Sequence, residues 1–187
     1  MKTVITSILL AAVLALIFSL PALGEESESI TITMTGVSEI SISLDKTQWQ
    51  LGEVATDMEH TTNPAIEWCT LEVIGNSAVK TFIVGEDARW YEDGVGKNYY
   101  WTLSDDGTNG ENVYGLLFRI SGDTTRGPLG NGYVPITKTQ GEFWPYSDHP
   151  PLEPGQYKQF GLKLLTPTYF VGNREMRTSI TISAVAA

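Results

Sequence analysis

Apolar and polar residues alternate with a period of two in one segment after another once the chain has passed Glu25. Successive side chains of a strand point to opposite faces, so this period predicts strands with one buried face. No segment after Glu25 shows the three- and four-residue spacing of an amphipathic helix. About ten strands are expected, at 30–35, 40–44, 49–54, 66–74, 79–84, 99–103, 113–120, 157–166 and 178–185, with a weak one near Val134.

Turn-forming residues separate these strands. Clusters of glycine, proline, asparagine and aspartate fall between them, among them Gly75-Asn76, Asp105-Asp106-Gly107 and Gly130-Asn131-Gly132. Turn signals at this spacing are typical of antiparallel meanders and Greek keys. We therefore expect an all-β fold, a two-sheet antiparallel β-sandwich of the jelly-roll or immunoglobulin-like Greek-key kind. Residues 122–154, rich in glycine and proline, are expected to form a long loop within this single domain.

The first 24 residues have the pattern of an export signal. Lys2 precedes a mostly apolar run that ends at Pro21, and Ala22-Leu23-Gly24 follows as a small-x-small tripeptide. This order is typical of a signal peptide, so we expect cleavage after Gly24 and a secreted or cell-surface domain at 25–187, free of the membrane. The alternative is a retained anchor, because the run is close to the shortest length that spans a bilayer.

Charge and cysteine content narrow the functional classes. Without Lys2 the chain has 11 basic and 22 acidic residues, a net charge of −11, so nucleic acid is not an expected partner. Cys69 is the single cysteine, which excludes an intramolecular disulfide. It lies in phase with Leu71 and Val73 on one strand face, and we interpret it as a buried, unreactive thiol rather than a nucleophile or an intermolecular bridge.

Two segments near the ends of the mature chain are nearly the same strand. Ser29-Ile30-Thr31-Ile32-Thr33 resembles Ser179-Ile180-Thr181-Ile182-Ser183. One interpretation is convergence of two strands on a common half-buried pattern. The other is that residues 25–36 form a donor strand, with Ile30, Ile32 and Met34 buried in the sheet of a neighbouring subunit.

One loop has the composition of a cation site. Asp105, Asp106, Asn109 and Glu111 lie on a glycine-rich loop, and clustered carboxylates and carbonyls suit calcium. The spacing departs from the twelve-residue calcium loop, so a solvated hairpin turn is the favoured interpretation. No other cofactor is expected. His60 and His149 lack a second histidine at ligand spacing, and no catalytic motif is present.

Aromatic residues gather in and beside the predicted turns. Trp90, Tyr91, Trp144 and Tyr146 are candidates for a platform that stacks on sugar rings. Residues 99–101 are also aromatic, but consecutive strand residues face opposite ways, so part of this aromatic set must pack in the core.

The opening Trp49-Gln50-Leu51-Gly52 and the Pro154-Gly155 turn before an amphipathic late strand resemble secreted β-sandwich proteins of prokaryotic surfaces. Among these the chain is most similar to the TasA and camelysin-like filament subunits. That resemblance implies a signal peptide followed by an N-terminal donor strand. Trp101-Thr102-Leu103 and Trp49-Gln50-Leu51 are also similar to motifs of the WxL cell-wall-binding domain, which has its second motif near the C-terminus, where residues 180–187 hold no tryptophan.

These observations predict an extracellular structural subunit of a cell-surface or biofilm filament, assembled by β-strand complementation, and not an enzyme. The expected partners are further copies of the chain or other surface proteins. The alternatives are a module that binds surface polysaccharide or cell wall, and a secreted hydrolase whose carboxylates meet only in space.

Overall fold

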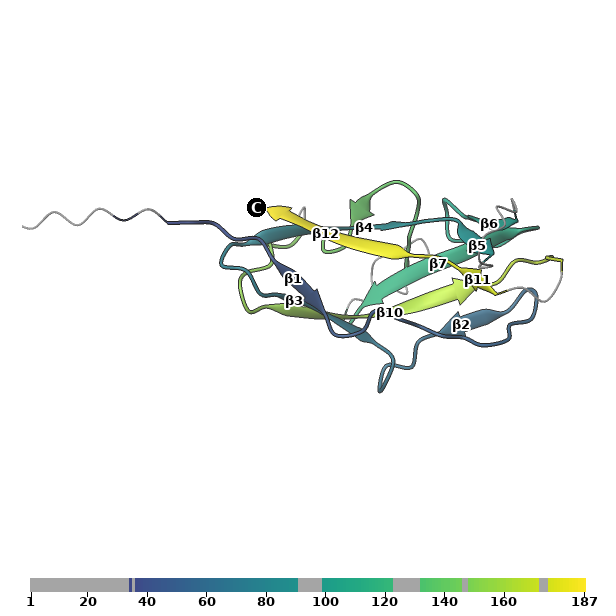
Figure 1. Ribbon diagram of the computed structural model, residues 1–187. Helices are drawn as coiled ribbons and strands as arrows, with labels where there is room; N and C mark the ends of the chain where they lie inside the picture. The colour runs from purple at the N-terminus through teal and green to yellow at the C-terminus, as the bar shows by residue number, and fades with distance from the viewer. Residues whose placement is uncertain (1–33, 35, 91–98, 123–131, 146–147, 172–174) are drawn as a thin grey trace, which may run out of the picture. The chain divides into compact units, whose positions relative to one another are not determined.

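The computed structural model describes residues 34, 36–90, 99–122, 132–145, 148–171 and 175–187. The chain divides into two units, Met1–Gly36 and Val37–Ala187, and every strand described below lies in the second (Figure 1). The described residues form strands, turns and irregular segments and contain no helix. Within the described ranges there is accordingly no helix of the length and hydrophobicity needed to cross a membrane.

The described residues form twelve strands. They are β1 (Ile42–Leu44), β2 (Glu59–Thr61), β3 (Cys69–Val73), β4 (Val79–Gly85), β5 (Ala88–Trp90), β6 (Tyr100–Leu103), β7 (Val113–Ile120), β8 (Val134–Pro135), β9 (Gly141–Glu142), β10 (Tyr157–Leu165), β11 (Met176–Arg177) and β12 (Ile180–Ala186).

These strands belong to two sheets. The nine-stranded sheet runs β1-β3-β10-β7-β6-β5-β11, with β2 beside β10 and β8 beside β7, and it curls into a half-barrel. The three-stranded sheet runs β12-β4-β9. β7 and β10, the two longest strands, pair from Phe160 opposite Ile120 to Leu165 opposite Gly115. The predicted all-β class is therefore confirmed, with the strands divided unequally between the sheets.

The long alternating segments are the ones that were predicted well. Strands occur at or within the segments expected at 40–44, 66–74, 79–84, 99–103, 113–120, near Val134, 157–166 and 178–185. The expected strand at 30–35 lies outside the described residues, apart from Met34. Four strands of two or three residues, β2, β5, β9 and β11, were missed because they are too short to show a period.

The strand predicted at 49–54 is wrong. Trp49 and Val54 pack against the core as expected, but the backbone there forms no strand. Gly52, between Leu51 and Val54, has a φ of 70°. This left-handed backbone conformation interrupts the extended conformation that a strand needs. The spacing of three residues from Leu51 to Val54 also departs from the period of two.

The hairpin predicted around residues 105–112 is also wrong, because β6 and β7 are parallel. Parallel neighbours usually need a longer crossover, yet here residues 104–112 make the connection. The loop folds back onto β7, so that a Cβ at Gly115 would collide with the carbonyl oxygen of Gly107. Gly107 itself has a φ of 79°. Both glycines are thus needed for the loop to pack this closely against β7.

One hydrophobic core contains side chains from both sheets. Val79 and Ile83 of β4 are buried in the same cluster as side chains of β3, β7 and β10. Phe143, which follows β9, stacks on Phe118 with ring centroids 5.5 Å apart and meets Phe160 edge-on at 5.0 Å. Offset and edge-on ring contacts add to the free energy gained by burying the rings.

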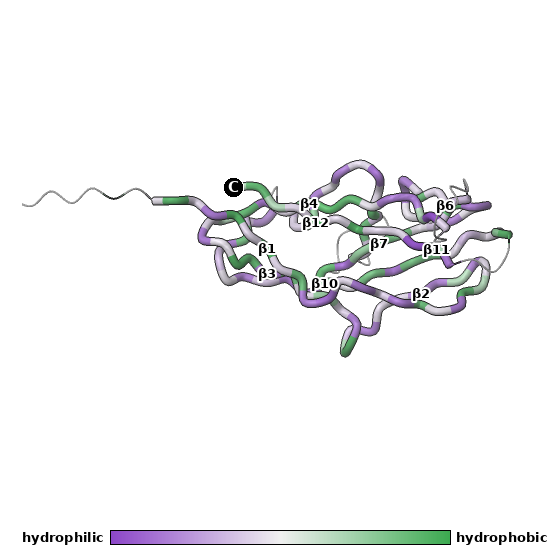
Figure 2. Tube along the Cα trace, viewed as in Figure 1, coloured by the Kyte–Doolittle hydropathy of each residue, from purple (hydrophilic) through white to green (hydrophobic). Residues whose placement is uncertain are grey.

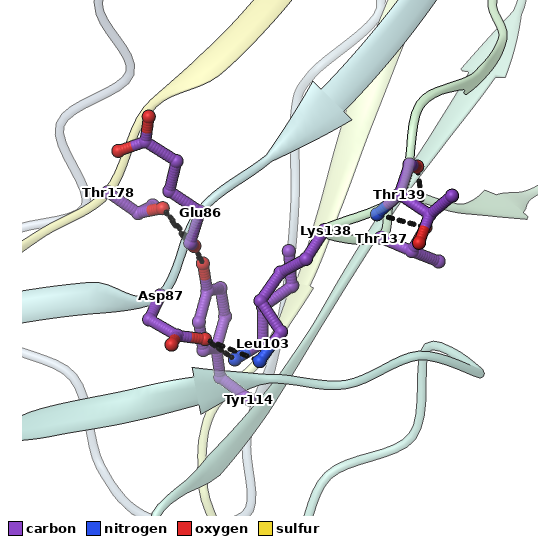
Figure 3. A network of polar contacts seen from close by, with 8 residues as sticks. All are labelled: Glu86, Asp87, Leu103, Tyr114, Thr137, Lys138, Thr139 and Thr178. Carbon is purple, nitrogen blue, oxygen red and sulfur yellow. Dashed lines mark hydrogen bonds and ion pairs between the residues drawn. The ribbon is translucent and has the colours of Figure 1, made fainter.

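A polar network ties together three places where the chain crosses between the sheets (Figure 3). The hydroxyl of Tyr114 on β7 donates to the carbonyl of Glu86, between β4 and β5, and lies 2.8 Å from Oγ1 of Thr178, between β11 and β12. Asp87 accepts a hydrogen bond from the Leu103 amide and forms a 3.2 Å ion pair with Lys138, between β8 and β9. Burial raises the pKa of Tyr114 to about 12.

Replacing Tyr114 by Phe should lower the free energy of unfolding by about 1–2 kcal/mol, because the Glu86 carbonyl and the Thr178 hydroxyl lose a buried partner. Urea unfolding monitored by tryptophan fluorescence measures this. Y157F is the matched control, since Tyr157 is 63% exposed, and it should leave the stability unchanged.

The same pair of variants has a pH signature. A tyrosine in the unfolded chain loses its proton near pH 10, whereas folded Tyr114 holds its proton to about pH 12. The protonated Tyr114 hydroxyl therefore contributes fully to the free energy of unfolding below pH 10, and this contribution is lost as the pH rises towards 12. Y114F should lose less stability than wild type in this range, and equal losses would contradict the buried hydroxyl.

Candidate functional site

The first residues of the compact unit are held by a dense set of hydrogen bonds. Asn76, in the turn between β3 and β4, accepts from the Glu39 amide through Oδ1 at 2.6 Å and donates through Nδ2 to the Val37 carbonyl at 2.8 Å. Ser38 and Ser77 join their hydroxyls at 2.6 Å. Gly75 allows this approach, because a Cβ there would collide with the Glu39 carbonyl. The direction in which the chain enters β1 is therefore fixed at residues 37–41.

The C-terminal strand ends at this same turn. The Ala187 amide donates to the Ala78 carbonyl at 3.1 Å, two residues from Asn76. β12 pairs with β4 along its whole length, from Ile180 opposite Gly85 to Ala186 opposite Val79. On its other side β12 has no strand partner among the described residues. It thus offers a seven-residue open edge whose backbone groups are free to pair with another strand.

Exposed apolar side chains occur at this end of the compact unit. Val37 is 78% exposed and Val185 is 46% exposed, although both are hydrophobic. Ile74, whose amide donates to the Ser41 carbonyl, is 57% exposed. In Figure 2 the apolar colour marks both the end of β12 and the stretch that precedes β1. Clustered exposed apolar groups are typical of a contact surface.

Most residues of the predicted donor strand belong to the part of the chain that the structure does not describe. Ile30 and Ile32 fall outside the described residues. Met34 is described, belongs to no strand and is 85% exposed. The boundary between the two units, after Gly36, coincides with the predicted end of the donor strand.

Two of the four candidate calcium residues, Asp106 and Asn109, direct their polar atoms to the protein itself. Asp106 Oδ1 accepts from the Ser104 hydroxyl at 2.6 Å and from the Thr108 hydroxyl and amide at 2.6 and 3.0 Å. These hydrogen bonds, from Ser104 first, lower the pKa of Asp106 to about 2. Asn109 donates to the Asp57 carboxylate and to the Thr166 carbonyl.

Glu111 forms an isolated bridge with Tyr169, and Asp105 lies in the same loop. Within the described ranges no three histidine, cysteine or acidic side chains converge as a metal site. Asp106 and Asn109 thus stabilise the short parallel connection through their own hydrogen bonds, and calcium binding at the four candidate residues stays a prediction.

The candidate sugar platform is divided between the sheets. Trp90 is a partly buried residue of β5 in the nine-stranded sheet, whereas Trp144 follows β9 of the three-stranded sheet. The Trp144 ring stacks on His149 at 4.3 Å, and the Lys158 ammonium lies 3.7 Å from its centroid. Tyr91 and Tyr146 lie outside the described residues. Trp144 is thus already engaged by its own chain.

Cys69 is half-buried on β3. Burial, and to a lesser extent Asp45, raises the pKa of its thiol. A raised pKa keeps the thiol protonated and weakly nucleophilic, in agreement with the interpretation of Cys69 as a structural residue.

A face that the sequence analysis missed lies on the outer side of the nine-stranded sheet. We call it the Trp68–Arg119 face, formed by Trp68, Arg119, Tyr133 and Lys163. The Arg119 guanidinium carbon lies 5.4 Å from the Trp68 ring centroid and 5.0 Å from that of Tyr133. The Lys163 ammonium is 4.5 Å from the Tyr133 ring. Gly161 was the signal in the sequence, because a glycine inside a strand marks a close approach, and a Cβ there would collide with Trp68.

No protein-family model and no curated protein matches the chain.

Adding calcium should leave the loop at 104–112 unchanged. At about 1 mM calcium, the affinity range of extracellular sites, backbone amide resonances of this loop should not shift selectively, because Asp106 and Asn109 are already engaged. A saturable shift confined to residues 105–111, absent in the D106N variant, would contradict this.

Proposed function

We propose that this protein is an extracellular structural subunit that assembles by strand addition, residues 25–36 of one copy pairing with the open edge of β12 in the next. The observation that carries the proposal is that edge, which is seven residues long and unpaired on one side within the described part of the chain. Export through the N-terminal signal and the resemblance to TasA-like subunits support the same assignment.

We call residues 25–36 the arm. The sequence of the arm resembles that of β12, the strand with which we propose that it pairs. Ile30 and Ile32 repeat the alternation of Ile180 and Ile182 with flanking Ser and Thr residues. Ile180, Ile182 and Ala184 are partly buried against the core. A strand beside β12 that places Ile30, Ile32 and Met34 on the same side would extend this apolar surface, and its backbone would pair with the free groups of the edge.

The hydrogen bonds of Asn76 favour a neighbouring copy over self-closure. Val37 is held beside the turn at which β12 ends. An arm that folded back on its own β12 would therefore run parallel to it. The three-stranded sheet is antiparallel throughout. A neighbour's arm is free to add in the antiparallel direction, which pairs somewhat more stably.

We further propose that the two sheets pack as a sandwich, with the curled nine-stranded sheet closing over the smaller one. The contacts of Phe143 with Phe118 and Phe160 support this arrangement. It leaves β12 at the margin of the smaller sheet, where an added strand would lie against the larger one.

The test is assembly of the exported chain, measured by negative-stain electron microscopy and sedimentation. Wild type should form filaments in a concentration-dependent manner. I30D/I32D should remain monomeric, because two carboxylates would be placed on the buried face of the added strand. T31D/T33D is the matched control with the same charge change on the opposite face, and it should still assemble.

A peptide of residues 25–36 should inhibit growth by occupying the β12 edge, whereas a scrambled peptide should not. Wild-type protein that stays monomeric at high concentration, or I30D/I32D filaments equal to those of wild type, would overturn the proposal.

A further inference from the structure

Cations concentrate around one tryptophan of this acidic protein. Of the eight lysines and arginines in the described ranges, three lie at Trp68 or its neighbours. Arg119 lies over its ring, Lys46 donates to its backbone carbonyl, and Lys163 lies over the adjacent Tyr133 ring. Glu59, Glu67 and Asp45 adjoin the same face, so its charges roughly balance, whereas the chain as a whole has a net charge of −10. Anions are therefore repelled less at this face than by the rest of this acidic protein.

Three acidic residues that adjoin this face are already engaged. Glu59 forms a 2.9 Å ion pair with Lys163, and Glu67 accepts from the Asn63 amide. Asp45 accepts from the Thr70 amide at 2.6 Å. None of these three carboxylates reaches Arg119, whose contacts within the described ranges are with the two rings.

The N–H donors of Arg119 have no hydrogen-bond acceptor among the described residues. The two cation–π contacts of Arg119 use the charge of the guanidinium and occupy none of the acceptors that its N–H donors could bind. Arg119 is partly buried, yet no described oxygen accepts from it. The two parallel donors of such a fork match the two oxygens of a carboxylate. The free group at this site is therefore complementary to a carboxylate.

The surroundings favour a sugar acid over an acidic peptide. Three outward positions that neighbour this face, Thr61, Thr70 and Gln159, are polar and would face the hydroxyls of a sugar. Leu117, the apolar outward position beside Arg119, is buried. A docked peptide would need apolar anchors. The large exposed apolar side chains of the described unit do not include any member of the Trp68–Arg119 face.

We propose that the Trp68–Arg119 face binds uronate residues of an acidic polysaccharide, with Arg119 holding the carboxylate and the Trp68 and buried Tyr133 rings holding the guanidinium in place. Lys46 and Lys163 add positive charge on either side. This activity is separate from filament assembly, because it uses the outer face of the nine-stranded sheet and not the edge of β12.

The experiment uses the exported chain, uniformly labelled with ¹⁵N, and trigalacturonate as the probe. The Trp68 indole N–H is buried without an acceptor in the described ranges, so its resonance, assigned with W68F, reports on this face. Trigalacturonate should shift it saturably, and the neutral trisaccharide galactotriose should not. Added salt should weaken the binding.

Variants of Arg119 and Lys46 distinguish the effect of positive charge on sugar binding from the effect of the planar guanidinium. R119Q should weaken trigalacturonate binding at least tenfold, and R119K nearly as much, because an ammonium lacks the planar fork. R89Q is the matched control, since Arg89 is exposed on β5, and it should bind as wild type. K46Q removes a cation without disturbing the two rings, and it should weaken binding severalfold even where R119Q fails to fold.

Three results would overturn the inference: equal binding of the neutral trisaccharide, wild-type affinity in R119Q or K46Q, and displacement of trigalacturonate by the 25–36 peptide, which would make the acidic arm the occupant. I30D/I32D should keep full trigalacturonate binding. Loss of assembly and loss of sugar binding are therefore distinguishable.

Discussion

The fold depends on one junction at which three crossings between the sheets are bonded to one another. The hydroxyl of Tyr114 contacts two of these crossings, and Asp87 connects the first to the third through Lys138. Each crossing leaves backbone groups that neither sheet satisfies, and unpaired buried polar groups are costly. The side chains of Tyr114, Asp87 and Thr178 satisfy several of them. The junction lies where β4 ends and β12 begins, and it thereby fixes these two strand ends relative to the nine-stranded sheet.

This junction also accounts for the open edge. β12 starts just after Thr178, beside β4, and the only other member of its sheet within the described ranges is β9, on the far side of β4. An open edge of seven residues invites uncontrolled pairing, which soluble proteins normally prevent with charges or prolines on the edge. β12 carries neither. Small and hydroxylated side chains flank its isoleucines, so the edge is accessible to a strand of similar sequence.

The sequence predicted the strands that follow a period and missed the features that depend on contacts distant in the chain. β4, β7 and β10 are long and half-buried, and their alternation was sufficient. The parallel pairing of β6 and β7 was not predictable from Asp105-Asp106-Gly107, because these residues suit a hairpin equally well. The close approach of Gly107 to Gly115 decides between the two. The Trp68–Arg119 face depends on strand register, which places Gly161 opposite Arg119, and register is not visible in local sequence.

The two proposed surfaces are compatible because they belong to different sheets. Strand addition at β12 uses the margin of the three-stranded sheet, whereas the Trp68–Arg119 face lies on the outer side of the nine-stranded sheet. A filament built in this way would repeat the face once per subunit. Single sugar sites are commonly weak, but repetition along a polymer raises the effective concentration for every binding event after the first. Assembly would therefore convert a modest affinity for uronate into firm attachment to an acidic polysaccharide.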